Sequence, residues 1–319
     1  MSEVEFTDIS PALSHNLKGH KKDITQLCFN PNEQQLVSSS FDHSLMLWNL
    51  SSPSQRCYKF AGHTGNVNCV QFSNSGKLVA SGSSDQTVRI WVAKLRGSSN
   101  EFRAHSSAVN SVMFSPSDDK ILTGSNDKSI KLWDTKTRIF TSSFIGHTNW
   151  VKCAKFARDE TFIASCGDDK TLRIWDINSG QCVSTFTPNG NVNHLAIHSN
   201  CTAVAIGSSR GSVRIYDLRA KKLQQHYMLH DNVMCVDWHP FANYLLTSGG
   251  DGTMKIVDIM EGKPLYTLEG HNMGVKTAVF SKSGDMFASG GFDKHVMVWK
   301  TNFLSLKSSP STSSTDSLS

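Results

Sequence analysis

No apolar run in this sequence approaches the ~18 residues that a membrane-spanning helix needs. Residues 1–10 also lack the apolar stretch of a secretory signal, and they include Glu3, Glu5 and Asp8. These absences predict a protein with no membrane partner, in an intracellular, reducing compartment. The eight cysteines are therefore expected to be thiols rather than disulfides.

Signatures of other protein classes are missing as well. There are 32 Lys and Arg against 27 Asp and Glu, and the basic runs are only pairs such as Lys21-Lys22, so we expect no nucleic-acid partner. No Cys-x-x-Cys pair, Gly-x-x-x-x-Gly-Lys loop or dinucleotide fingerprint occurs, and we expect neither a metal nor a cofactor. Hydrophobic residues make up 38% of the chain, which is enough for a sizeable core.

What the sequence does contain is an internal repeat. Seven equivalent positions follow one another at intervals of 41 to 43 residues, and five of them are tryptophans. These positions are Trp48, Trp91, Trp133, Trp175, Tyr216, Val257 and Trp299. A histidine precedes six of them by 27 or 28 residues, which fixes the phase of the repeat.

Each repeat has the strand pattern of a propeller blade. In the second repeat, 67–72, 78–82 and 87–91 are short apolar segments separated by turn residues such as Ser75, Gly76 and Asp85, and a less regular fourth segment follows. Seven such units predict an all-β, seven-bladed propeller. Because no fourth strand follows Trp299, we expect residues 12–17 to complete the last blade.

Six repeats also share a polar set of His, Ser or Thr, Asp and Trp. Such residues can form an acyl-transfer triad, but an active site needs one set, whereas this set occurs six times. We therefore predict a buried structural chain in which the Asp accepts from the His and the hydroxyl links the His to the Trp indole. No catalytic residue is predicted, and we expect the protein not to be an enzyme. The members are His20, Ser38, Asp42, Trp48; His63, Ser81, Asp85, Trp91; His105, Thr123, Asp127, Trp133; His147, Ser165, Asp169, Trp175; His230, Thr247, Asp251; and His271, Ser289, Asp293, Trp299.

The fifth repeat lacks the whole polar set. Pro188, Ile206, Arg210 and Tyr216 stand at the four positions. This is expected if the network works only when complete, because a partly satisfied buried network is costly. The sixth repeat has Val257 in place of the Trp, so its network should stop at the hydroxyl.

The repeats and the end of the chain give the domain boundaries. We predict a propeller over residues 1–303 and a disordered Ser/Thr-rich tail over 304–319. No heptad pattern follows the last repeat, and the chain as given is expected to be monomeric.

The repeat resembles the WD-repeat family over roughly residues 11–303, most clearly at Trp133-Asp134 and Trp175-Asp176. More particular stretches resemble the Proteome of Centriole 1 family of centriolar WD-repeat proteins. They are 86–92, 101–105, 149–156, 225–227, 260–262 with 265–268, 287–291 and 296–303. This resemblance implies a non-enzymatic scaffold that supports centriole assembly, stability or duplication and cilium formation.

The same resemblance implies partners and a location. The partners would be centriolar or microtubule-associated proteins, and the location would be the cytoplasm and cytoskeleton, at the centrosome, the centriole and the basal body of the cilium. Members of that family usually continue into a coiled coil, which this sequence does not show. The alternative is a WD-repeat adaptor that recruits substrates in a signalling or ubiquitin-ligase complex, and fold alone does not separate the two.

One surface is expected to dock a protein partner. The residue before the repeat Asp is small or polar in five repeats but is Phe41 in the first and Phe292 in the seventh. Because these repeats are neighbours in a closed ring, the two aromatic residues predict a shared apolar patch. The alternative is that both fold inward over the ring's rim. The candidate protein-binding residues are Phe41, Phe292, Lys21, Lys22, Met273 and Trp150.

Overall fold

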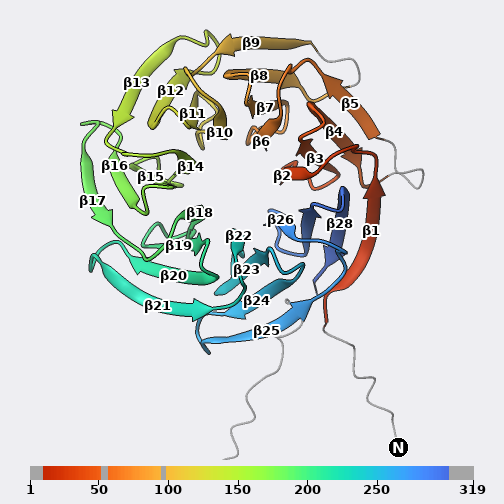
Figure 1. Cartoon of the computed structure of the whole chain (residues 1–319). Helices are drawn as coiled ribbons and strands as arrows, with labels where there is room; N and C mark the ends of the chain where they lie inside the picture. The colour runs from red at the N-terminus through yellow and green to blue at the C-terminus, as the bar shows by residue number, and fades with distance from the viewer. Residues whose placement is uncertain (1–9, 52–56, 95–97, 302–319) are drawn as a thin grey trace, which may run out of the picture.

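Seven four-stranded sheets form a closed ring of blades in the computed structural model of the chain (Figure 1). The structure describes residues 10–51, 57–94 and 98–301, and every regular element in these ranges is a β-strand. The seven-bladed, all-β propeller expected from the repeat is therefore confirmed. The predicted tail over 304–319 lies outside the described residues.

The strands of the first four blades in chain order, after the N-terminal β1 (Ala12–Lys18), are β2 (Ile24–Phe29), β3 (Gln35–Ser40), β4 (Ser44–Asn49), β5 (Cys57–Ala61), β6 (Val67–Phe72), β7 (Leu78–Ser83), β8 (Thr87–Val92), β9 (Ser99–Arg103), β10 (Val109–Phe114), β11 (Lys120–Ser125), β12 (Ser129–Asp134), β13 (Phe140–Ile145), β14 (Val151–Phe156), β15 (Phe162–Gly167), β16 (Leu172–Asp176) and β17 (Cys182–Phe186). The last three blades contain β18 (Val192–Ile197), β19 (Ala203–Ser208), β20 (Ser212–Asp217), β21 (Lys222–Met228), β22 (Val233–Trp238), β23 (Tyr244–Gly249), β24 (Met254–Asp258), β25 (Lys263–Leu268), β26 (Val275–Phe280), β27 (Met286–Gly291) and β28 (His295–Lys300).

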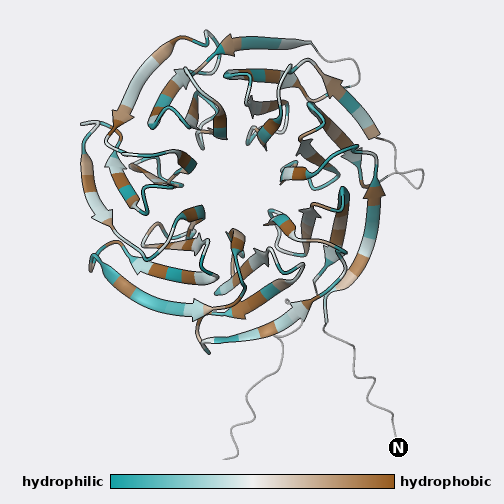
Figure 2. Cartoon of the chain, in the orientation of Figure 1, coloured by the Kyte–Doolittle hydropathy of each residue, from teal (hydrophilic) through white to brown (hydrophobic). Residues whose placement is uncertain are grey.

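Burial follows the order of the strands within a blade. The second strand is almost completely buried, as in β7 and β11, because blades on both sides cover it. The fourth strand is the outermost one (Figure 1), and at least half of the positions in β13 and β21 are exposed. Hydrophobic and hydrophilic segments accordingly alternate along these outer strands in Figure 2. The core of the protein is therefore a ring of apolar layers between blades.

Small residues let neighbouring blades approach each other. A Cβ added to Gly82 would lie 2.6 Å from Cγ1 of Val109 in the next blade, and one added to Gly207 would lie 2.4 Å from Cγ1 of Val233. Both valines are fully buried. Glycine at these places is thus required by packing between blades rather than by backbone conformation.

The ring closes through the N-terminal strand. The last sheet has the order β1-β28-β27-β26, with Ala12 opposite Lys300 and Leu17 opposite Val296. Leu17 is 2% exposed and packs in the apolar cluster between the last and first blades. The closure predicted from the missing fourth strand is confirmed, and it joins the two ends of the chain in one sheet.

Candidate functional site

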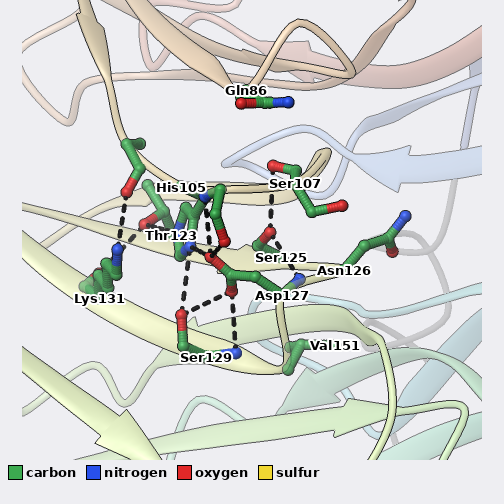
Figure 3. A network of polar contacts seen from close by, with 12 residues as sticks. Gln86, His105, Ser107, Thr123, Ser125, Asn126, Asp127, Ser129, Lys131 and Val151 are labelled. Carbon is green, nitrogen blue, oxygen red and sulfur yellow. Dashed lines mark hydrogen bonds and ion pairs between the residues drawn. The ribbon is translucent and has the colours of Figure 1, made fainter.

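In the six repeats that carry it, the polar set forms a chain of hydrogen bonds, and Figure 3 shows His105, Thr123, Asp127 and Ser129 of this chain in the third blade. The Trp133 indole N–H donates to the Thr123 hydroxyl at 3.0 Å, and that hydroxyl lies 2.7 Å from Nε2 of His105. Nδ1 of His105 lies 2.8 Å from the Asp127 carboxylate, which also accepts from the Ser129 hydroxyl at 2.6 Å. The Asp thereby fixes the turn that begins the third strand.

The same chain recurs in the other blades that carry the set. The histidine lies 2.7–3.0 Å from its hydroxyl and 2.7–2.9 Å from its nearest carboxylate oxygen. Four further tryptophans, Trp48, Trp91, Trp175 and Trp299, donate to the hydroxyl at 2.7–3.0 Å. In the sixth blade Val257 is fully buried and the network stops at the Thr247 hydroxyl, which lies 3.2 Å from the Lys255 carbonyl oxygen, just as the Thr123 hydroxyl lies 3.3 Å from that of Lys131.

The direction of these bonds sets the protonation state of the histidines. Because the indole N–H donates to the hydroxyl, the hydroxyl proton can point to Nε2, and Nδ1–H then donates to the Asp. Burial lowers the pKa of His63 and His105, although their carboxylate partners act in the opposite direction. Burial opposes ionisation of Asp169, but the interactions with its partners, His147 foremost and then Thr171 and the backbone of Thr148, together outweigh burial and hold its pKa at about 2. In the second and third blades a neutral imidazole therefore faces a carboxylate.

These sets are poorly placed for chemistry on a substrate. The hydroxyls of Ser38, Ser81 and Thr123 belong to residues with no exposed surface. Each hydroxyl is already shared between a histidine and a tryptophan, so a reacting carbonyl has no route to it. The arrangement instead satisfies buried polar groups and ties the second and third strands of a blade to the loop before its first strand.

The fifth blade holds the same turn without the network. Tyr216 packs against Phe186 with ring centroids 4.7 Å apart, and Arg210 is exposed. The hydroxyls of Ser208 and Ser212 bond to each other at 3.0 Å across the turn. Apolar packing thus replaces the whole chain of polar bonds.

The predicted docking residues differ in how accessible they are. Lys21 and Lys22 are exposed and Met273 is 55% exposed. Phe41 and Phe292, expected to be exposed, are instead half-buried. This is a correction with a physical reason: Phe41 lines a central cavity, and the Phe292 ring lies against Gly274.

Trp150 belongs to a separate part of the same face, in the fourth blade. It is 47% exposed, and the Lys152 ammonium lies 4.9 Å from its ring centroid. Lys152 also forms an ion pair with Asp168 at 3.1 Å. The structure therefore gives two exposed clusters on opposite sides of the ring, with the central cavity between them.

The central cavity is a feature that the sequence reasoning missed. Its volume is about 230 Å³, and all seven blades contribute to its wall. The lining residues are Thr25, Gln26, Phe41, Asn68, Asn110, Ser111, Lys152, Cys153, Asn193, His194, Met234, Cys235, Lys276 and Thr277. Most of them come from the second and third positions of the innermost strands, so the alignment of repeats contained the signal.

A side chain at the second position of the innermost strand joins four blades to their neighbours. The Thr25 hydroxyl donates to the Val67 carbonyl at 2.7 Å. The amides of three asparagines make the equivalent bond: Asn68 to Val109 at 2.9 Å, Asn110 to Val151 at 2.7 Å and Asn193 to Val233 at 2.8 Å. The other three blades have Lys152, Met234 and Lys276 there. The ring of bonds is thus interrupted where two cations enter the cavity.

The cysteines and histidines outside the network give no metal site in the described ranges. All eight cysteines are free. Cys153 and Cys235 lie on either side of the fifth blade, whose His194 has Nδ1 3.5 Å from the Cys235 sulfur. Among the residues described, no group of three or more His, Cys, Asp and Glu is arranged to hold an ion. Nor does this part of the chain include a helix suited to crossing a membrane.

Comparison with known proteins places the repeats in a family. The family model described as "WD domain, G-beta repeat" matches seven segments of the chain. They are residues 12–49, 54–92, 97–134, 138–176, 180–217, 221–258 and 262–300. Each segment ends at the third strand of one blade, so each begins with the fourth strand of the blade before it.

Relatives with this repeat match over short segments. Denticleless protein homolog A of Xenopus laevis is 34% identical over 104 residues, which are 31% of this chain and 15% of the relative. The human Denticleless protein homolog is 32% identical over 123 residues, 37% of this chain and 16% of that protein. Human WD repeat-containing protein 37 is 39% identical over 83 residues, which are 26% of this chain and 17% of that protein. The aligned segments thus span less than a fifth of these relatives.

Proposed function

Because this chain belongs to the WD-repeat family, we propose that it is a non-enzymatic platform on which other proteins dock. The proposal rests on the way in which the six polar sets are bonded. Their hydroxyls are buried and bonded within the blades, whereas Trp150, Met273 and the Lys21–Lys22 pair remain accessible on one face. Accessible aromatic and basic residues are typical anchors of protein interfaces.

Geometry defines the docking face. Consecutive strands are antiparallel, so the turn after the repeat His and the turn that bears the repeat Asp open on the same side of the ring. We call this side the turn face. It includes Lys21, Lys22, Trp150 and Met273, and the central cavity opens on it beside Phe41. A partner that covers the ring here would contact both exposed clusters at once.

Two cellular roles fit such a platform. The comparisons support the adaptor role better, because the matched relatives are Denticleless proteins and WD repeat-containing protein 37, and neither name refers to a centriole. In this role the propeller recruits a substrate to a signalling or ubiquitin-ligase complex.

The second role is a centriolar scaffold, and a different observation favours it. Particular stretches such as 86–92, 149–156 and 296–303 resemble the Proteome of Centriole 1 family and are spread over the whole propeller. In contrast, the Denticleless and WD repeat-containing protein 37 matches cover only 26–37% of the chain.

One experiment separates the roles. A tagged chain is imaged in dividing cells, and its bound proteins are identified after cross-linking. Diffuse signal together with ubiquitin-ligase subunits supports the adaptor, whereas centrosomal foci with centriolar proteins support the scaffold. Recovery of no specific protein would count against the docking proposal itself.

A further inference from the structure

The central cavity carries positive charge that its own wall does not neutralise. The described residues that line it include two lysines, Lys152 and Lys276, and no Asp or Glu. An ammonium group loses hydration inside a ring of protein and gains most from a nearby anion. The charge balance of the wall therefore favours a negatively charged occupant.

The two lysines differ in how they are satisfied. Lys152 has Asp168 as an ion-pair partner at 3.1 Å and the ring of Trp150 beside it. Lys276, at the equivalent position of the seventh blade, has no ion pair or hydrogen bond among the described residues. Burial and the charge of Lys152 both lower the pKa of Lys276. An anion between them would relieve the repulsion.

A neutral donor stands next to Lys276. Thr277 is 2% exposed and lines the same cavity, and its hydroxyl has no hydrogen-bond partner among the residues that the structure describes. An unpartnered buried hydroxyl is costly, and an oxygen ligand in the cavity would satisfy it. The seventh blade thus supplies a cation and an adjacent O–H donor from consecutive residues.

We propose that the central cavity binds a carboxylate side chain of an acidic partner segment, held by Lys152, Lys276 and the hydroxyl of Thr277. A cavity of about 230 Å³ admits one or two side chains but not a folded element. Phe41 offers apolar contact to the methylene groups that carry such a carboxylate. The inference rests on the proposed docking function, because the segment must be presented by a protein seated on the turn face.

The test uses calorimetric titration of the full chain with a peptide that carries a short run of glutamates between glycines, capped at both ends. Its twin has glutamine at those positions. We expect the glutamate peptide to bind, the twin not to bind, and the affinity to weaken as salt screens the charges. Inorganic phosphate at the same concentration should not displace the peptide.

Two variants locate the site. Lys276→Met removes the charge, and Met234 shows that methionine fits the equivalent position of the sixth blade; the affinity should fall at least about tenfold. Lys77→Met, which removes an exposed lysine in the turn between β6 and β7 on the opposite face, should leave the affinity unchanged. Equal binding of the two peptides, displacement by phosphate, or unchanged binding by Lys276→Met would overturn the proposal.

The failure of this inference is distinguishable from failure of the docking function. Partner recruitment in cells is scored independently with a variant that replaces Trp150 and Met273 on the turn face. If recruitment depends on these residues but the peptide result is negative, only the cavity site is refuted. If recruitment is insensitive to them, the docking face itself is refuted.

Discussion

The Ser283 hydroxyl donates to a carboxylate oxygen of Glu33 at 2.9 Å, which joins the last blade to the first on the side opposite the turn face. The Asp118 carboxylate accepts a hydrogen bond from the backbone N–H of Ser75 at 2.8 Å, and the Glu160 carboxylate accepts one from the backbone N–H of Ser117 at 2.6 Å. Similar hydrogen bonds therefore link other neighbouring blades. Ring closure thus depends on side-chain bonds between blades as well as on the shared sheet.

The N-terminal strand makes the larger contribution to closure. Deletion of residues 1–18 removes β1, uncovers the edge of β28 and exposes the apolar layer around Leu17. We expect a lower melting temperature and a broader transition. The measurement is calorimetry of the deletion variant beside Glu33→Gln, which should lose at most ~1–2 kcal/mol because it removes one charged partner at the surface. A deletion variant that melts cooperatively at the wild-type temperature refutes the closure argument.

The polar network makes blade two more sensitive than blade five. Asp85→Ala leaves Nδ1 of the buried His63 without its carboxylate and should cost ~1–3 kcal/mol of unfolding free energy. Arg210→Ala replaces an exposed residue in the equivalent turn and should cost less than ~0.5 kcal/mol. Denaturant melts of both variants decide the question, and equal losses would show that the network adds nothing.

The same network predicts a pH dependence of stability. Burial lowers the pKa of His63, His105, His230 and His271 below the ordinary value of 6.5, so the unfolded chain binds protons before the folded one does. Their contribution is complete above about pH 6.5 and declines as the pH falls below it. Chemical unfolding at a series of pH values should show this decline.

The control for this titration is an exposed histidine. His226→Gln, on the outer strand β21, should leave the pH dependence as it is. His63→Gln should reduce the slope, since one of the four shifted groups is gone. A stability that stays constant between about pH 7 and pH 5 contradicts the assignment of neutral buried histidines.

Backbone geometry distinguishes two glycines that follow the Asp position. Gly211 and Gly252 both have positive φ, 78° and 83°. A Cβ on Gly211 would lie 1.7 Å from the His230 carbonyl oxygen, whereas one on Gly252 would be 3.3 Å from that of Met273. Gly252→Ala should therefore cost ~1–2 kcal/mol from the left-handed conformation alone, and Gly211→Ala should cost clearly more. Thermal melts of the pair test this, and equal costs would contradict it.

The interrupted ring of bonds between blades can be repaired at one position. Met234→Asn places an amide where Asn193 occupies the preceding blade, so it should donate to the Val275 carbonyl and raise the unfolding free energy by ~0.5–1.5 kcal/mol. Asn68→Met is the reverse change and should lower stability by a similar amount. No gain from Met234→Asn, together with no loss from Asn68→Met, would contradict the contribution assigned to these bonds.

Much of the fold was predictable because the repeat is long and its marker residues are chemically distinctive. Trp48 to Trp299 fix the register of seven blades, and the absence of a strand after Trp299 identifies the N-terminal closure. The network also follows from spacing, because four polar residue types recur in phase. The sequence also identifies the fifth blade as the one without the network, because Tyr216 and Arg210 stand at its Trp and Asp positions.

The surface was harder to predict for a physical reason. A turn position tells which face a residue is on, but not whether its side chain lies flat, points outward or turns into the cavity. Phe41 and Phe292 occupy the same position in neighbouring blades, yet only Phe41 lines the cavity. Whether a side chain enters the cavity depends on contacts across the ring, which no local pattern contains.

The central claim is that proteins dock on the turn face, and recruitment by matched variants tests it most directly. Trp150→Ala combined with Met273→Ala removes two exposed anchors, and Phe241→Ala removes a more exposed aromatic residue from the opposite face. Cross-linked partners of each chain are quantified by mass spectrometry after melting curves verify intact folding. The account predicts loss of the main partners for the double variant and none for Phe241→Ala. Unchanged recruitment by the double variant would contradict the account, and so would loss of the main partners by Phe241→Ala instead.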